Sequence, residues 1–347
     1  MVGRPAAGLP AAVRAALAQG ARECLVRNLC LHRELLRLLG ELNRAGVPVI
    51  PLKGSFLAHE LYGDLALRPM SDIDLLVRPE DVPRSDAVLR ATGCIRATEQ
   101  GADYHTSYVT RDGGDAGVVV ELHHHLAERH TARLDIRSVW ASASRIGWEG
   151  REIWTMALPD LFLYLCLHAA KDGLASLRSL LDIVLVAERC RDTLPWGALV
   201  HTVQAAGIRN PVYTTLAEAR GLLEAPVPPE FLRAIRPSWG LGWPLSRALL
   251  RWRGGVLHVP PALLVGPVMA ILMLLWEDSL RGRLRHVRRN LFPSASLRAR
   301  WIPLAAPSSG LVGSLLWLRQ AGRELTGQVT ARSRSGGGRR PRRRDTS

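Results

Sequence analysis

The alternation of apolar and polar residues that marks β-strands ends near Pro159, and every later apolar pattern has helical spacing. Before that point, short apolar runs and a hairpin pattern around Asp112 lie between helical segments. This order predicts an α+β fold, with a small mixed β-sheet and flanking helices, followed by an all-α region. We expect N-terminal helices over 1–45, an α+β domain over 46–157, a helical domain over 158–328 and a disordered Arg-rich tail over 329–347.

The individual elements follow from the spacing of apolar residues and from Gly and Pro breakers. Strands are expected at 47–52, 73–77, 104–110, 117–123 and 152–156. Helices are expected at 11–44 (as one or two), 56–62, 79–92, 134–142, 161–170, 174–190, 196–206 and 211–223, then through 253 and again at 311–325. The PVPP segment at 226–229 is expected to be a linker.

The net charge of +15 is concentrated at the C-terminal end of the chain. Residues 1–280 hold 30 Lys and Arg against 29 Asp and Glu, a difference of +1, whereas 281–301 and 332–344 hold seven Arg each. We expect the tail to be a solvated polycation that contacts nucleic acid or an anionic surface weakly, and a protein tethered through this end is an alternative. The 47% of hydrophobic residues excludes a mostly disordered chain.

The cysteines and the apolar runs indicate where in the cell the protein is expected to be. The five cysteines are odd in number and form no CxxC pair, which fits a reducing cytoplasm. The segment 256–276 has the length of a membrane span, but three prolines and a glycine interrupt it. We therefore expect a cytoplasmic protein without a membrane span and a buried helix over 268–276.

The string RPMSDIDLLV at 68–77 carries the first candidate for chemistry. On a strand, residues two apart share a face, so Asp72 and Asp74 point to one side while Ile73 and Leu75 enter the core. Two adjacent carboxylates repel unless a cation lies between them, and a divalent metal such as Mg²⁺ is the usual one. Without it the pair stores repulsion, so Asp74→Asn is expected to leave the apo protein as stable or slightly more stable. A solvated strand end is the alternative reading.

The string VVVELHHH at 118–125 supplies a third carboxylate. Glu121 and His123 share a strand face, and Glu121 is expected beside the Asp pair on a neighbouring strand. Three acids on two strands can hold two metals for phosphoryl or nucleotidyl transfer. A zinc site made by the three consecutive histidines is disfavoured, because side chains alternate along a strand.

The string PLKGS at 51–55 reads as a strand-to-helix turn. Gly54 allows close approach of a phosphate to the backbone, and Lys53 and the Ser55 hydroxyl are placed to bind the same anion. Lys53 and Lys171 are the only lysines among 46 basic residues. Because Lys is a compact point charge that Arg does not replace at every site, their retention favours a function, although chance retention is the alternative.

Four motifs follow one another along the chain: LKG, a helix ending in LYGD, RPMSDIDLLV and ELH. Together they resemble the uncharacterised nucleotidyltransferase family of the DNA polymerase β superfamily. The resemblance covers roughly residues 30–300, and the segment at 158–186 resembles that family's second domain, with its His and Asp at His168 and Asp182. It implies a glycine-serine turn before an Asp-x-Asp strand, a third acid on a later strand and nucleotidyl transfer. It implies no settled substrate.

His168 and Lys171 are i, i+3 neighbours on one predicted helix and should face the same side. Asp182 lies on the next helix and could pair with either of them. One interpretation is an inter-helix polar clasp; the other is a face that covers the nucleotide, with Lys171 toward the phosphates.

These observations predict a Mg²⁺-dependent nucleotidyltransferase (EC 2.7.7-type) that moves an NMP group from an NTP to a hydroxyl of a small molecule, a protein or an RNA end. Two Mg²⁺ ions are expected, with Mn²⁺ as an alternative. The expected metal ligands and catalytic residues are Asp72, Asp74 and Glu121. The expected nucleotide-binding residues are Lys53, Gly54, Ser55, Arg68, His123, His168, Lys171 and Asp182. The alternative function is a catalytically silent nucleotide- or partner-binding module, antitoxin-like, on the same fold.

Overall fold

The structure is a computed structural model of the chain. The structure describes residues 9–97, 104–110, 117–127, 134–174, 176–237, 248, 267–278 and 280–291. The expected helices that reach 253 and cover 311–325, and the Arg-rich tail, lie mainly or wholly outside these residues.

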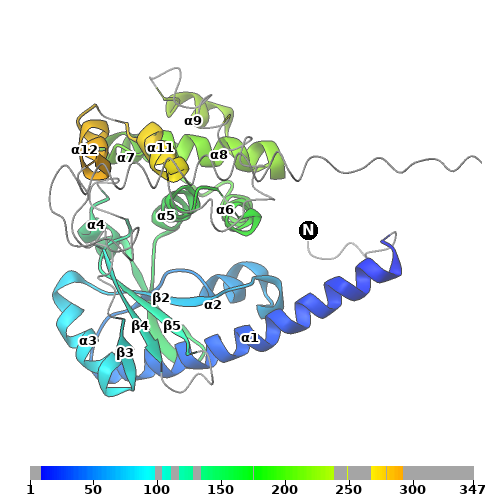
Figure 1. Cartoon of the computed structure of the whole chain (residues 1–347), viewed down its shortest axis with the longest axis vertical. Coiled ribbons are helices and arrows are strands. Elements are labelled where there is room, and N and C mark those ends of the chain that lie inside the picture. Colours follow the sequence, from blue (N-terminus) through cyan, green and yellow to red (C-terminus); the bar gives the residue numbers. More distant parts are fainter. Residues whose placement is uncertain are drawn as a thin grey trace, which may run out of the picture.

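A long helix, α1 (Ala11–Arg44), runs beneath the sheet as one unbroken element (Figure 1). Its sheet-facing leucines are buried at helical spacing: Leu31, Leu35, Leu38, Leu39 and Leu42. Gly46, with φ of +66°, directs the chain back toward the first strand. The apolar stripe of this helix therefore packs against one face of the sheet.

Five strands form the main sheet in the order β1-β2-β5-β4-β3. They are β1 (Ile50–Pro51), β2 (Asp72–Leu76), β3 (Cys94–Arg96), β4 (His105–Thr110) and β5 (Val119–His123). β2 pairs with β5 in parallel and the other pairs are antiparallel, so the sheet is mixed, as the sequence predicts. The expected hairpin of 104–110 with 117–123 is the β4–β5 pair.

Short helical elements connect these strands. The chain passes from β1 into α2 (Ser55–Leu57), a π-helix (Ala58–Tyr62) and a 3₁₀ turn (Leu65–Leu67) before β2. A 3₁₀ turn (Pro79–Asp81) and α3 (Val82–Ala91) follow β2. The helix expected at 56–62 is therefore largely a π-helix, a distinction that apolar spacing does not make over a single turn.

A second sheet, with two strands, follows the main sheet along the chain. It follows α4 (Ile136–Ser142) and consists of β6 (Ser144–Trp148) and β7 (Arg151–Thr155). The sequence predicts only β7, because β6 reads Ser-Arg-Ile-Gly-Trp and has little apolar alternation. The backbone N–H of Trp154 donates to the Val49 carbonyl at 2.9 Å, which joins this hairpin to the segment before β1.

The remaining described elements are helices, in agreement with the predicted all-α region. They are α5 (Leu158–Lys171), α6 (Leu177–Arg189), α7 (Trp196–Ala206), α8 (Arg209–Leu223), α9 (Pro229–Ala234), α11 (Pro267–Trp276) and α12 (Leu280–Leu291). α5 and α6 lie on the side of the sheet opposite α1 (Figure 1). The sheet is thus enclosed between the long helix and this helical layer.

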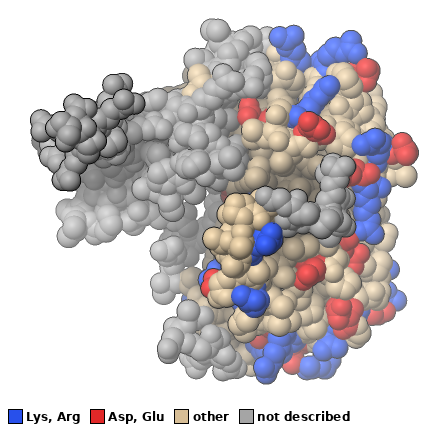
Figure 2. Space-filling view, turned by 90° about the vertical axis from the view of Figure 1, so that its right-hand side faces the viewer, with Lys and Arg blue, Asp and Glu red and all other residues tan. Residues whose placement is uncertain are grey.

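The apolar segment that could be read as a membrane span contains α11, whose Leu272 and Trp276 are buried. Among the described helices, none is long and apolar enough to cross a bilayer. On the face drawn in Figure 2, acidic and basic side chains are interspersed over the described surface. This matches the balance of charges in residues 1–280.

Candidate active site

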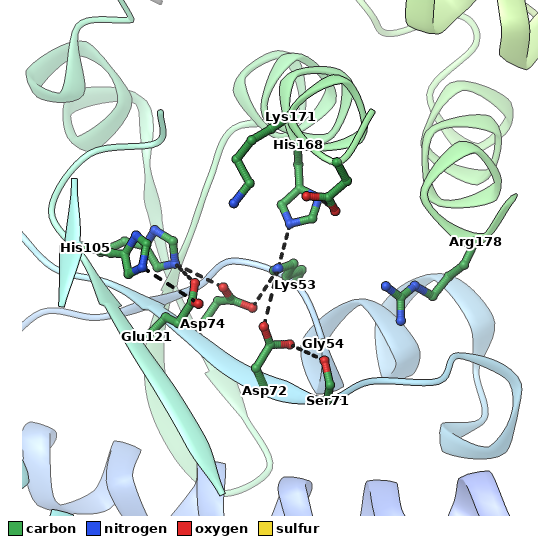
Figure 3. A network of polar contacts seen from close by, with 12 residues as sticks. Lys53, Gly54, Ser71, Asp72, Asp74, His105, Glu121, His168, Lys171 and Arg178 are labelled. Carbon is green, nitrogen blue, oxygen red and sulfur yellow. Dashed lines mark hydrogen bonds and ion pairs between the residues drawn. The ribbon is translucent and has the colours of Figure 1, made fainter. Parts of the chain in front are cut away.

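Three carboxylates meet where β2 and β5 run in parallel (Figure 3). The register pairs Asp74 with Glu121, so the two side chains leave adjacent strands on the same face. The Asp74 side chain is 1% exposed, whereas Asp72 and Glu121 are 27% and 23% exposed. The adjacency of the three acids that strand alternation predicts is therefore present, with Asp74 at the bottom of the site.

His123 joins two of these acids. Its Nε2 lies 3.0 Å from Asp74 Oδ1 and 3.2 Å from Glu121 Oε2. Burial by itself lowers the pKa of His123, but its hydrogen bonds to the two carboxylates outweigh burial and raise it. Burial likewise raises the pKa of Glu121, but the hydrogen bond from His123 and the charges of His105 and His123 together outweigh it, so the net shift is downward. A proton on His123 thus neutralises part of the acidic charge.

The same three residues fit a divalent cation. One donor atom each from Asp74, Glu121 and His123 lie within 4.8 Å of one another, and two carboxylates with an imidazole are a common donor set for such ions. Asp72, which the sequence places among the metal ligands, is outside this group. His123, expected to bind the nucleotide, is inside it.

Lys53 lies between the two aspartates of β2 (Figure 3). Its Nζ is 3.1 Å from Asp74 Oδ2 and 3.9 Å from Asp72 Oδ2. Burial by itself raises the pKa of Asp74, but Lys53 and His123 outweigh it and hold that pKa well below its usual range. An ammonium group therefore lies between the two acids and offsets part of the repulsion that the sequence predicts for the metal-free protein.

Asp72 has the opposite shift. Burial and then the charge of Asp74 raise its pKa, and Lys53 offsets only part of this. Lys53 is closer to Asp74 by 0.8 Å, since the two distances are 3.1 and 3.9 Å. The two aspartates that the sequence treats alike thus differ in environment: Asp74 is buried between Lys53 and His123, and Asp72 is the more exposed carboxylate with the higher pKa.

α5 covers the site from above through His168 and Lys171. His168 Nε2 lies 2.7 Å from Lys53 Nζ, and its Nδ1 lies 3.2 Å from Asp172 Oδ2. Burial, and next the charge of Lys53, hold the pKa of His168 well below its usual range, so the neutral ring accepts a hydrogen bond from the ammonium. Lys171 donates to the Tyr104 hydroxyl at 3.1 Å. Both side chains point toward the sheet (Figure 3), so they lie on the same side of the helix, as their i, i+3 spacing predicts.

Asp182 has other partners than the sequence suggests. Its carboxylate accepts two hydrogen bonds from Arg68, at 3.0 and 2.8 Å, and one from the Tyr62 hydroxyl at 2.6 Å. The expected pairing with His168 or Lys171 is wrong, because the Asp182 side of α6 faces the segment before β2. The Arg68 side chain is 4% exposed and its guanidinium is bound to Asp182, so this pair forms a polar clasp between α6 and the segment before β2.

The turn after β1 carries Gly54 and Ser55. Gly54 has φ of +62°, a left-handed conformation that favours glycine, and it lets the chain turn directly from Lys53 into α2. The Ser55 hydroxyl lies 2.6 Å from His32 Nδ1 of α1 and is buried. A small cavity at this turn is lined by Lys53, Gly54, Ser55, Met70, Asp72 and Asp74.

Sequence reasoning missed His105 of β4. Its ring lies 5.1 Å from that of His123, and its Nε2 is 3.8 Å from Glu121 Oε1. Burial lowers the pKa of His105 to about 4, although Glu121 opposes the shift. The β4–β5 register pairs His105 with His123. The predicted hairpin therefore already placed His105 and His123 on neighbouring strands. Alternation alone does not tell which residues of the two strands are paired, because this register depends on the connection between the strands.

Carboxylates gathered on adjacent strands, with a cation donor set and a lysine beside them, are the arrangement of sites for phosphoryl and nucleotidyl transfer. The chain belongs to the family of uncharacterised nucleotidyltransferases, which it matches over residues 4–224, more than half of its length. This agrees with the family resemblance of its motifs.

Two solved structures are similar to this chain. One is the antibiotic-resistance factor ANT(2'')-Ia, with 14% identity and a TM-score of 0.36 over 58% of this chain and 97% of that chain. The other is an antigenic nucleotidyltransferase-like protein from Paracoccidioides brasiliensis, with 13% identity and a TM-score of 0.32 over 57% of this chain and 88% of that chain. No curated protein gives a significant match.

Proposed function

We propose that the protein transfers an NMP group from an NTP to a hydroxyl acceptor and that the transfer depends on a divalent cation, Mg²⁺ or alternatively Mn²⁺. The observation that carries this proposal is the register of β2 with β5, which brings donor atoms of Asp74, Glu121 and His123 within 4.8 Å of one another. When bound, such a cation polarises phosphoryl oxygens and lowers the pKa of an attacking hydroxyl.

The residues of the chain have separate tasks in this proposal. Asp74, Glu121 and His123 would hold the cation. Lys53, which follows β1, and Lys171, which lies on α5, would attract the triphosphate through their positive charges. Asp72 remains at the more exposed side of the site, where an acceptor enters. Arg68 and Asp182 would act through structure, by fixing α6 against the turn that precedes β2.

The acceptor class is open between a small molecule, a protein and an RNA end. The test is incubation of the full chain with each α-³²P-labelled NTP, Mg²⁺ or Mn²⁺ and host extract, followed by separation of the products. Label that moves to a low-molecular-weight compound, a protein band or RNA identifies the acceptor class. An Asp74→Asn preparation is the matched control, and label transfer that persists in this variant contradicts the proposal.

A second candidate is a catalytically silent module that binds a nucleotide or a protein partner. One observation favours it: Lys53 and His123 already neutralise much of the acidic charge, so the fold does not need a metal to hold these acids together. Thermal shift separates the two functions. Stabilisation by NTP without label transfer supports the silent module.

We also propose a cytoplasmic location, which the odd number of cysteines without a CxxC pair supports. Weak contact of the Arg-rich tail with nucleic acid or an anionic surface stays a prediction. Deletion of residues 330–347 should remove salt-sensitive retention on heparin and leave nucleotide binding unchanged.

A further inference from the structure

The two oxygens of Asp74 face different cationic groups. Oδ1 lies 3.0 Å from His123 Nε2, and Oδ2 lies 3.1 Å from Lys53 Nζ. In sites that hold two metals, a shared carboxylate can bridge both positions. Here one side of Asp74 belongs to the donor group with Glu121 and His123, and the other side faces an ammonium group that also lies 3.9 Å from Asp72.

The main chain on both sides of Lys53 and the side chain of His168 hold the ammonium in this place. The backbone N–H of Leu52 donates to the Asp74 carbonyl at 3.1 Å, which fixes the main chain beside β2. Gly54, with its positive φ, turns the chain directly after Lys53. His168 accepts from the ammonium at 2.7 Å and is itself oriented by Asp172. The Lys53 side chain is only 14% exposed, so these contacts are made away from bulk water.

We propose that Lys53 is a built-in cation that fills the second metal position, between Asp72 and Asp74, so that the site binds a single divalent ion at Asp74, Glu121 and His123. A second divalent ion does not enter between Asp72 and Asp74, because the ammonium group already occupies that position and the two positive charges would repel. The catalytic meaning of this inference rests on the proposed function, but the number of bound ions can be measured without turnover.

The test counts Mn²⁺ ions bound to the full-length protein without nucleotide, by equilibrium dialysis with electron paramagnetic resonance of free Mn²⁺. The wild type should bind one ion per chain. Lys53→Met keeps most of the side-chain packing and removes the charge, so it should gain a second ion or bind the first at least about tenfold more tightly. Lys53→Arg keeps the charge and should stay at one ion.

Lys171→Met is the matched control, since it removes the other lysine of the chain from the same site without touching the Asp72–Asp74 pair. It should stay at one ion. Circular dichroism checks that each variant is folded, and the wild-type count decides alone if Lys53→Met does not fold. Two ions or none in the wild type, or unchanged number and affinity in Lys53→Met, would overturn the inference.

Label transfer measured on the same preparation separates this inference from the proposed function. Two bound ions together with label transfer refute the role of Lys53 and leave the function standing. One bound ion in the wild type, with the expected change in Lys53→Met and no label transfer under any condition, supports the role of Lys53 and refutes the function.

Discussion

Replacing Asp74 with Asn removes the negative charge at the bottom of the site and tests the electrostatics directly. The carboxylate is 1% exposed and contacts Lys53 and His123 at 3.1 and 3.0 Å. Removing one partner of a buried ion pair costs about 3–5 kcal/mol, because the other partner is left uncompensated. Here Lys53 keeps Asp72 and His168, and His123 keeps Glu121. We therefore expect a loss of about 2–3 kcal/mol, below the full penalty.

The loss should appear as a lower melting temperature of the metal-free protein, by about 4–10 °C. Asp72→Asn is the control on the same strand. Because burial and Asp74 raise the pKa of Asp72, its charged form is disfavoured in the folded state, and its neutralisation should leave the melting temperature unchanged or raise it slightly. Two acids that merely repel each other predict that Asp74→Asn is neutral or stabilising. That result would refute the pairing with Lys53.

Three further predictions concern metal choice, the clasp and pH. The wild-type protein should bind Mn²⁺ more tightly than Mg²⁺, because an imidazole ligand suits Mn²⁺ better. His123→Asn should reduce the difference between the two affinities. Equal affinities of the wild type for the two ions, measured by calorimetry, contradict this prediction. Arg68→Lys loses the two-pronged bond to Asp182 and should cost about 2–3 kcal/mol in stability without changing the Mn²⁺ count, whereas a variant as stable as the wild type rules out the clasp. Burial raises the pKa of Glu277 to about 7, so its proton stabilises the fold at low pH and this stability is lost as pH rises from its unfolded pKa toward 7. Because Glu277 is only half-buried, solvent screens part of this effect, and Glu277→Gln should flatten the decline in stability by no more than about 1 kcal/mol; an identical pH profile of melting in both proteins contradicts this prediction.

The parts of the site that follow from neighbours in sequence were predictable. Asp72, Asp74, Glu121 and His123 belong to two strands whose alternation is visible in single segments, and this period fixes which side chains share a face. The antiparallel hairpin and the helical region from α5 to α8 follow from equally local patterns. Strand alternation alone therefore predicts that the acids share a face, and no information on packing is needed.

The remaining contacts join residues that are far apart along the chain. Lys53 meets His168 at a separation of 115 residues, and Arg68 meets Asp182 at a separation of 114. Such pairs depend on how α5 and α6 pack on the sheet, which no local period encodes. The sequence therefore identified Lys53 as a candidate anion ligand but did not reveal that its first partners are acids of its own chain.

The contact of His168 with Lys53 also has a consequence for biosynthesis. The acids and Lys53 leave the ribosome long before α5, and at about 5–20 residues per second the 115 residues between Lys53 and His168 take roughly 6–23 seconds to make. During that interval a nascent chain can pair its strands, but the lysine has no histidine acceptor. Translation that stops between residues 121 and 168 therefore yields a polypeptide with all three acids but without the histidine that holds Lys53. The capacity to bind nucleotide should accordingly be acquired late, when α5 packs onto the sheet.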